Sequence, residues 1–287
     1  MILVTGATGR VGYRLMEALA DARADVAAMV RVEAKADDLP GTPRHVVATL
    51  DKPPAAAVLR EFDRIFLLSP EIEEQAELET VFIDAVVAAG HRPHIVKVCA
   101  DGFQDPGCDV RFMRAHQQVA LHLEAVGLPV TYLAAATYME DLLDDAEQIR
   151  RTGEVRAAAG DGRAGFIAAA DVAAVAARVL TTDGHEGATY VLTGPEALSY
   201  ADIAARFSAV FAWQVEYADL PPHRERELLL ASGRTPWEAD GAIERFNWIR
   251  HGGAGSVTGT VTELTGAGPR PLQEWLGDSR EDFADLP

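Results

Sequence analysis

The sequence predicts a doubly wound α/β domain followed by a smaller, mostly helical lobe. Two observations carry this prediction. Short apolar runs alternate with helical segments through the first half of the chain, and the first run leads into three glycines spaced three residues apart. Runs that are apolar on both faces are typical of parallel strands covered by helices. The 287 residues suffice for one main domain with a lobe.

Composition excludes several classes of protein. The formal net charge of −18 leaves no basic face for nucleic acid or an anionic membrane surface. The two cysteines, Cys99 and Cys108, do not form a CxxC pair, which indicates free thiols in a reducing compartment. His91 and His94 lack companion carboxylates, so no metal site is expected. An apolar strand starting at residue 2 and the lack of a membrane-length apolar run favour a soluble, cytoplasmic protein.

The first half reads as a parallel sheet with its covering helices. Val11, Leu15 and Leu19 form one apolar face of a helix that follows the glycines. Acidic residues between 71 and 79 are interpreted as the solvated face of a later helix. The expected strands span residues 2–5, 25–30, 45–50, 65–68, 95–98 and 130–133, and the expected helices include 73–89 and 110–126.

The alternation loosens after Tyr138. A helix is expected at 139–151, a turn at 160–162, a short strand at 166–167, a helix at 171–180 with an acidic N-cap, and a last strand at 189–192. Ser199 and Asp202 fit a capping box that opens another helix. We therefore expect a nucleotide-binding domain over residues 1–137, later strands around 164–192 completing its sheet, and mainly a substrate-binding lobe over 138–287.

The glycine motif Gly6-x-x-Gly9-x-x-Gly12 indicates a dinucleotide site. It follows a strand and opens an amphipathic helix, which is the context that gives such a motif weight. Glycines allow the backbone to approach a pyrophosphate, and the helix N-terminus favours negative charge. The alternative is that these glycines only make a turn. The GxxGxxG spacing resembles the extended or atypical branch of the short-chain dehydrogenases.

Arg31 indicates which dinucleotide is bound. It follows the second strand, where a carboxylate usually selects NAD and an arginine accommodates the 2′-phosphate of NADP(H). Arg10, inside the glycine loop, can reach the same phosphate, and each charge-assisted bond contributes roughly 1.5–3 kcal/mol. The alternative is a solvated surface arginine. We expect NADP(H).

Several longer segments resemble the NmrA-like atypical short-chain dehydrogenases. They are residues 2–9, 66–70, 159–163 with 166–167, 171–173, 192–199, and 263–266 with 269–270. The resemblance covers nearly the whole chain and implies a Rossmann domain with a small substrate lobe. It also implies a cofactor site made of Gly6, Thr8, Gly9, Arg10, Val11, Gly12, Arg31, Leu68, Ser69 and Cys99.

The chain departs from this family where proton chemistry is expected. The superfamily's Tyr-x-x-x-Lys pair is absent, and the only lysines are Lys35, Lys52 and Lys97. His116 falls where relatives often hold His or Lys, and an imidazole that titrates near neutrality suits a general acid. Tyr138 follows the sixth strand near the ligand-binding edge of the sheet. These are the candidate catalytic residues; a structural histidine and a packing tyrosine are the alternatives.

Cys99 follows the fifth strand at a position that is often serine in relatives. A nucleophilic role would need a lowered pKa, and Lys97 is the sole nearby cation in sequence, which alternation sends to the same side. We favour inert burial for this thiol.

The resemblance implies an NADPH-dependent oxidoreductase acting on a quinone, enone or related carbonyl compound. Met113, Met139 and the tryptophans suit an apolar or aromatic small-molecule substrate, although such residues are usually core. A homodimer is compatible with this class of protein. Two alternatives stay open: an NADP(H)-sensing regulator without turnover, and a tailoring enzyme that cyclises, isomerises or dehydrates an aromatic metabolite.

Overall fold

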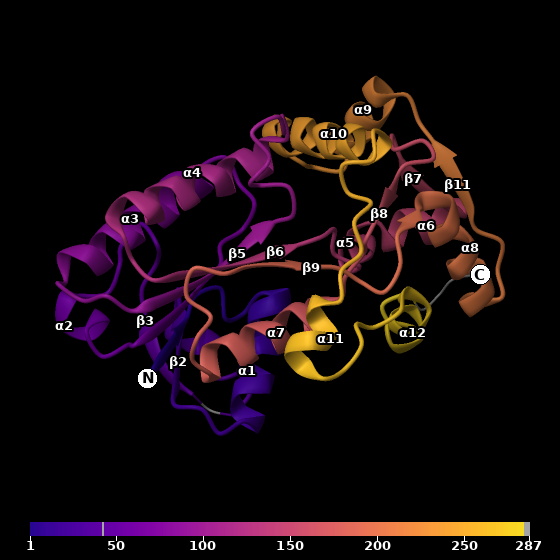
Figure 1. Ribbon diagram of the computed structural model, residues 1–287. Helices are drawn as coiled ribbons and strands as arrows, with labels where there is room; N and C mark the ends of the chain where they lie inside the picture. The colour runs from indigo at the N-terminus through magenta and orange to yellow at the C-terminus, as the bar shows by residue number, and fades with distance from the viewer. Residues whose placement is uncertain (42, 284–287) are drawn as a thin grey trace. The chain divides into compact units, whose positions relative to one another are not determined.

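The computed structural model describes residues 1–41 and 43–283 (Figure 1). The chain divides into two compact units, each built from three segments. Unit 1 comprises Met1–Cys99, Arg114–Ala134 and Ala169–Tyr190, and unit 2 comprises Ala100–Met113, Ala135–Ala168 and Val191–Pro287. The C-terminal part of the chain therefore contributes a helix to the first unit.

A seven-stranded sheet with the order β3-β2-β1-β4-β5-β6-β9 organises unit 1. Its neighbouring strands are parallel where the register is defined: Leu3 of β1 pairs with Ala27 of β2 on one side and with Ile65 of β4 on the other. The strands are β1 (Ile2–Val4), β2 (Val26–Val30), β3 (Arg44–Val47), β4 (Arg64–Leu67), β5 (His94–Ala100), β6 (Val130–Ala135) and β9 (Thr189–Leu192). This order is that of a doubly wound nucleotide-binding sheet, as the sequence predicts.

Helices cover both faces of this sheet (Figure 1). α1 (Arg10–Asp21) and α7 (Ala169–Thr181) pack together on one face. α3 (Gln75–Ala88) and α4 (Arg111–Val126) lie on the other, and the short α2 (Ala56–Leu59) contacts α3. The predicted apolar face of α1 is buried, with Leu15 and Leu19 fully inaccessible. The β2–β3 connection includes a 3₁₀ turn at Glu33–Lys35.

Unit 2 is mainly helical with two small sheets. Its β11 (Glu216–Asp219) pairs in parallel with β7 (Glu154–Ala157), and β10 (Leu198–Ser199) pairs antiparallel with β8 (Arg163–Ala164). Its helices are α5 (Asp141–Asp144), α6 (Ala146–Thr152), α8 (Tyr200–Phe211), α9 (Pro222–Ala231), α10 (Pro236–Arg250), α11 (Thr260–Thr265) and α12 (Leu272–Asp278). The capping box predicted at Ser199 and Asp202 is present at the start of α8.

The structure corrects four details in the second half of the chain. The expected helix at 139–151 is divided into α5 and α6, because Asp145 leaves helical geometry between them. The short strand lies at Arg163–Ala164, whereas Ile167 makes only an isolated bridge. β9 is not the last strand, since β10 and β11 follow it. α7 begins at Ala169, so Asp171 lies in its first turn and is not its cap.

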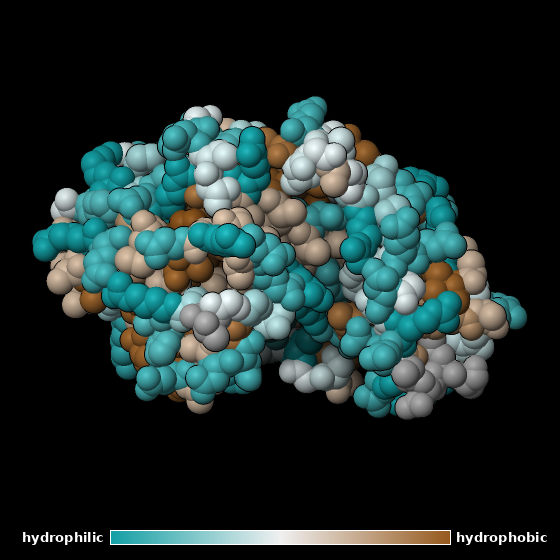
Figure 2. Space-filling model, turned by 90° about the horizontal axis from the view of Figure 1, so that it is seen from below, coloured by the Kyte–Doolittle hydropathy of each residue, from teal (hydrophilic) through white to brown (hydrophobic). Residues whose placement is uncertain are grey.

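Hydrophilic residues dominate the face drawn in Figure 2, and hydrophobic residues appear there in small, separate groups. The large hydrophobic side chains that are exposed lie singly along the sequence, Leu121 at 59% exposure being the most accessible of them. Among the helices described, none is both long and apolar enough to cross a membrane.

Candidate functional site

The glycine loop closes a turn that other residues could not make. Gly6 has a φ of +62°, in the left-handed region, and a β-carbon there would lie 3.0 Å from the carbonyl oxygen of Leu68. A β-carbon on Gly12 would lie 2.0 Å from the carbonyl oxygen of Gly6. The Gly9 N–H donates to that same oxygen at 2.9 Å. The loop therefore requires glycine at positions 6 and 12.

The first turn of α1 is available to an anion. Gly9 is the N-cap and provides no side-chain cap, and the first N–H groups of a helix lack partners within the helix. Thr8, Gly9 and Arg10 are exposed, whereas Val11 is buried. An exposed helix N-terminus behind a loop that needs glycine fits the pyrophosphate of a dinucleotide.

Thr5 fastens the glycine loop to the end of β4. Its hydroxyl donates to the carbonyl oxygen of Leu68 and accepts from the Leu68 N–H, both at 2.9 Å. Thr5 is fully buried. The predicted cofactor residues Gly6 and Leu68 are thereby held side by side. Sequence reasoning did not single out Thr5, although its place directly before Gly6 is a usable signal.

Arg31 follows β2 directly and is exposed. No hydrogen bond or ion pair to another described residue engages its side chain. Its guanidinium is therefore available to an external anion. Arg10 is also exposed, at the start of α1.

A buried polar network lies next to Ser69, directly beyond β4. Ser69 Oγ donates to Glu79 Oε1 at 2.6 Å, and Lys97 Nζ donates to the same oxygen at 3.0 Å. Lys97 Nζ also donates to the carbonyl oxygen of Val98. Glu79 and Lys97 are fully inaccessible and Ser69 is 7% exposed. The expectation that the acids at 71–79 form a solvated face is wrong for Glu79, because its carboxylate neutralises a buried lysine.

His116 lies in the second turn of α4 and is 4% exposed. Its Nδ1 is 3.2 Å from Nε2 of the buried Gln75, at the start of α3. Burial, followed by the charge of Lys97, lowers the pKa of His116 well below its ordinary value. The premise that this imidazole titrates near neutrality is therefore wrong. Gln75 itself has no feature in the sequence that distinguishes it from a surface residue.

Cys99 lies within β5, one residue before its end, and not after the strand. Its side chain is 1% exposed, and burial raises the pKa of its thiol to about 12 despite the opposing charge of Lys97. A thiol with such a pKa is not a nucleophile at neutral pH.

Tyr138 belongs to unit 2 and His116 to unit 1. Tyr138 forms the isolated bridge to Ile167 and is half-buried. Met139 and Trp275, two of the residues named for an apolar ligand, lie in the core of unit 2. Within unit 1, Ser69, Cys99 and His116 thus lie around the buried Lys97–Glu79 pair. Tyr138 belongs to unit 2 and is considered separately.

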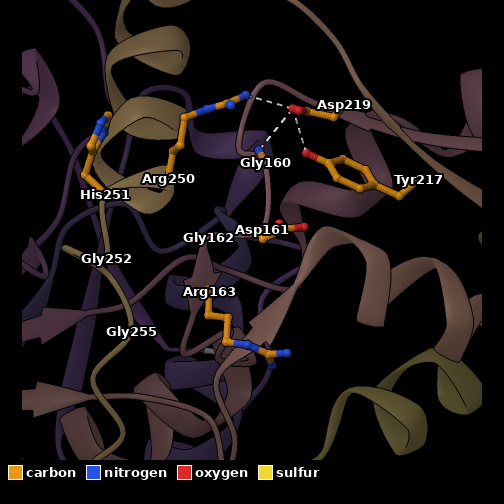
Figure 3. A pocket seen from close by; sticks show the side chains of 10 residues that line it. All are labelled: Gly160, Asp161, Gly162, Arg163, Tyr217, Asp219, Arg250, His251, Gly252 and Gly255. Carbon is orange, nitrogen blue, oxygen red and sulfur yellow. Dashed lines mark hydrogen bonds and ion pairs between the residues drawn. The ribbon is translucent and has the colours of Figure 1, made fainter.

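Unit 2 contains an open hollow of about 820 Å³ (Figure 3). Asp219 Oδ1 accepts there from the Gly160 N–H, the Tyr217 hydroxyl and Arg250 Nη2. Arg163 points away from this group in Figure 3 and is paired with Asp202. Both arginines of the hollow are therefore already paired with acids, Arg250 with Asp219 and Arg163 with Asp202.

Comparison with known proteins agrees with this geometry. Residues 1–266 match the model of the NmrA-like family. The chain is 33% identical to the (4-alkanoyl-5-oxo-2,5-dihydrofuran-3-yl)methyl phosphate reductase of Streptomyces griseus, over 99% of both chains. It is 30% identical to the NAD(P)H azoreductase of Xenophilus azovorans, over 96% of both.

Among solved structures, it is similar to an NADPH-dependent quinone oxidoreductase from Escherichia coli complexed with NADPH. The TM-score is 0.87 and the identity 27%, with 97% of this chain and 99% of that chain covered. The resemblance inferred from the sequence motifs is confirmed. This chain belongs to the NmrA-like family.

Proposed function

We propose that the protein is an NADPH-dependent oxidoreductase that reduces a quinone, an enone or a related conjugated carbonyl compound. The observation that carries the proposal is the glycine loop. A β-carbon on Gly12 would collide with the Gly6 carbonyl group, and Gly6 has a left-handed φ. That loop, together with an exposed Arg31, supports NADPH as the cofactor.

The proposed cofactor contacts follow the edge of the sheet. The N–H groups of Arg10 and Val11, at the start of α1, would hold the pyrophosphate, with Thr8, Gly9 and Gly12 completing the loop. Arg31 and Arg10 would hold the 2′-phosphate. Leu68, Ser69 and Cys99 would line the part of the site nearest the reacting ring. When bound, NADPH supplies the hydride.

The proposed acceptor contains a carbon–carbon double bond conjugated to a carbonyl group. A quinone has this arrangement, and so does the dihydrofuranone ring in the name of the Streptomyces griseus relative. Reduction adds a hydride to one end of the conjugated system and a proton to the other. His116 is the proposed residue at the acceptor's oxygen, and solvent supplies the proton. Tyr138, in unit 2, stays a separate candidate catalytic residue. An apolar or aromatic acceptor suits the largely apolar composition of such sites.

Two broader features belong to the same proposal. A cytoplasmic location is supported by the two cysteines, which are free and buried. The protein is also proposed to form a homodimer, and the elution volume of the purified protein on a calibrated column tests this.

Turnover tests the function directly. The purified protein is mixed with NADPH and either a simple quinone or a cyclic enone, and the loss of NADPH absorbance is followed. We expect saturable oxidation with at least one of the two acceptors, and a higher kcat/KM with NADPH than with NADH. If neither acceptor oxidises NADPH, the proposed activity is rejected.

A second candidate is an NADP(H)-sensing protein without turnover. The absent Tyr-x-x-x-Lys pair favours it, because the superfamily's usual acid is missing. Equal affinities for NADP⁺ and NADPH, with no oxidation of NADPH by any acceptor, would support this candidate. Rapid reduction of any small acceptor would eliminate it.

A further inference from the structure

The surroundings of His116 in unit 1 restrict which ring nitrogen carries a proton. Gln75 contributes an amide nitrogen 3.2 Å from His116 Nδ1. An amide NH₂ group has two donors and no acceptor. With the Gln75 amide in this orientation, Nδ1 accepts and the neutral ring carries its proton on Nε2. A cationic imidazolium, which donates through both nitrogens, is incompatible with this contact.

The charges around the ring favour the same state. Lys97 on β5, which is paired with Glu79 on α3, is a charged group that acts on His116, and the Cys99 thiol on β5 is neutral. Lys97 and burial both lower the pKa of His116. Glu79 accepts from both Lys97 and Ser69 through Oε1. Both effects favour the neutral imidazole.

The network is not arranged for stability alone. Gln75 Oε1 and Glu79 Oε2 are buried and have no hydrogen-bond partner among the described residues. A buried polar atom without a hydrogen-bond partner destabilises the folded state. The two residues lie one turn apart on α3, so both unsatisfied oxygens belong to the same small region. Apolar residues at these positions would make the folded state more stable. The polar residues therefore point to a functional reason.

We propose that Gln75 and the buried Lys97–Glu79 pair hold His116 as a neutral imidazole protonated on Nε2, which donates a hydrogen bond to the acceptor's oxygen. Gln75 is then a positioning residue that acts through His116. The inference rests on the proposed reductase function and specifies its chemistry: His116 polarises the carbonyl group as a neutral donor, while the proton comes from solvent. His116 follows the carboxyl end of β5, and Gln75 follows that of β4, where open α/β sheets bind ligands.

The protonation state can be measured without turnover. The protein is prepared with ¹⁵N-labelled histidine, and the ring nitrogens are recorded by NMR between pH 5.5 and 8.5 in the absence of cofactor. The His116 signals are identified as those missing from His116→Gln. We expect His116 to remain neutral across this range, with Nδ1 unprotonated. A proton on Nδ1, or an ordinary titration near pH 6.5, overturns the proposal.

Substitution of Gln75 tests whether its hydrogen bond fixes the tautomer of His116. Gln75→Met keeps the length of the side chain and removes its donor, so the two neutral tautomers should exchange and the Nδ1 and Nε2 signals should approach each other. We expect kcat for quinone reduction to fall severalfold, with an unchanged KM for NADPH. Gln118→Met is the matched control, because Gln118 is exposed on the same helix as His116. Its spectrum and kinetics should match those of the wild type.

Each outcome separates this inference from the proposed function. If wild-type His116 is locked on Nε2 but no acceptor is reduced, the proposed function fails and the hydrogen-bond arrangement stands. If acceptors are reduced while Gln75→Met folds and leaves both the tautomer and kcat unchanged, the positioning role of Gln75 is rejected. Should Gln75→Met not fold, the wild-type spectrum alone decides the protonation state.

Discussion

Gly12 packs against Gly6 so closely that a β-carbon on Gly12 would lie 2.0 Å from the Gly6 carbonyl oxygen. The first turn of α1 is thereby pressed onto the loop at the end of β1. The close contact brings the helix N-terminus to the point where a pyrophosphate would bind. Even the methyl side chain of alanine at position 12 would therefore disturb the loop.

We therefore expect Gly12→Ala to weaken NADPH binding by at least about tenfold and to lower the free energy of unfolding by about 1–3 kcal/mol. Fluorescence titration with NADPH and urea unfolding measure the two effects. Gly277→Ala is the control, since a β-carbon at Gly277 would meet no atom within 4 Å. Wild-type affinity in Gly12→Ala would show that the observed loop is not the cofactor site.

Arg31→Ala should discriminate between the two nicotinamide cofactors. NADPH carries a 2′-phosphate that NADH lacks, and the exposed guanidinium is expected to bind that group. NADPH affinity should therefore fall about tenfold or more, and NADH affinity should barely change. Arg14→Ala removes an exposed arginine from α1 and controls for overall charge. Equal losses for both cofactors would mean that Arg31 does not read the 2′-phosphate.

The glycine loop could be predicted from the sequence because its determinants are local. Gly6, Gly9 and Gly12 lie within one strand-turn-helix segment, and their conformational requirements do not depend on distant residues. The same holds for the capping box at Ser199 and Asp202, which joins residues three apart. Such local features do not depend on how the rest of the chain packs.

The buried network could not be predicted because it depends on long-range packing. Glu79 reads as one more acid in a charged segment until Lys97, on β5, is known to lie against α3. The β7–β11 pair also joins residues that are far apart in sequence. A signal for β7 did exist, since Glu154, Val155, Arg156 and Ala157 alternate between polar and apolar, but the run is too short to decide.

The Lys97–Glu79 pair should show strong energetic coupling. Lys97→Met leaves an uncompensated carboxylate in a fully buried site, and we expect it to cost about 3–5 kcal/mol of unfolding free energy. Glu79→Gln should be comparably harmful. The double variant should recover much of this loss, because no buried charge remains. Urea unfolding of the four proteins measures the coupling, and additive losses would contradict it.

Glu225 in unit 2 should make stability depend on pH. It is 5% exposed, its Oε2 has no hydrogen-bond partner in the described chain, and burial together with the charge of Asp145 raises its pKa to about 7. The unfolded chain releases this proton near pH 4.5, so the folded state binds more protons between these two values. Stability should therefore be full below pH 4.5 and fall as the pH rises through 7, by no more than about 3 kcal/mol.

Glu225→Gln removes this titration and should be more stable than the wild type at pH 8. The difference between the two unfolding free energies should shrink as the pH is lowered towards 4.5, which urea unfolding at a series of pH values measures. Glu227→Gln is the matched control, because Glu227 is exposed on the same helix α9 and paired with Arg224. Since Asp145 also titrates with a raised pKa, of about 6, only the difference between Glu225→Gln and wild type isolates Glu225. A difference that stays constant with pH would place the folded pKa of Glu225 at its ordinary value.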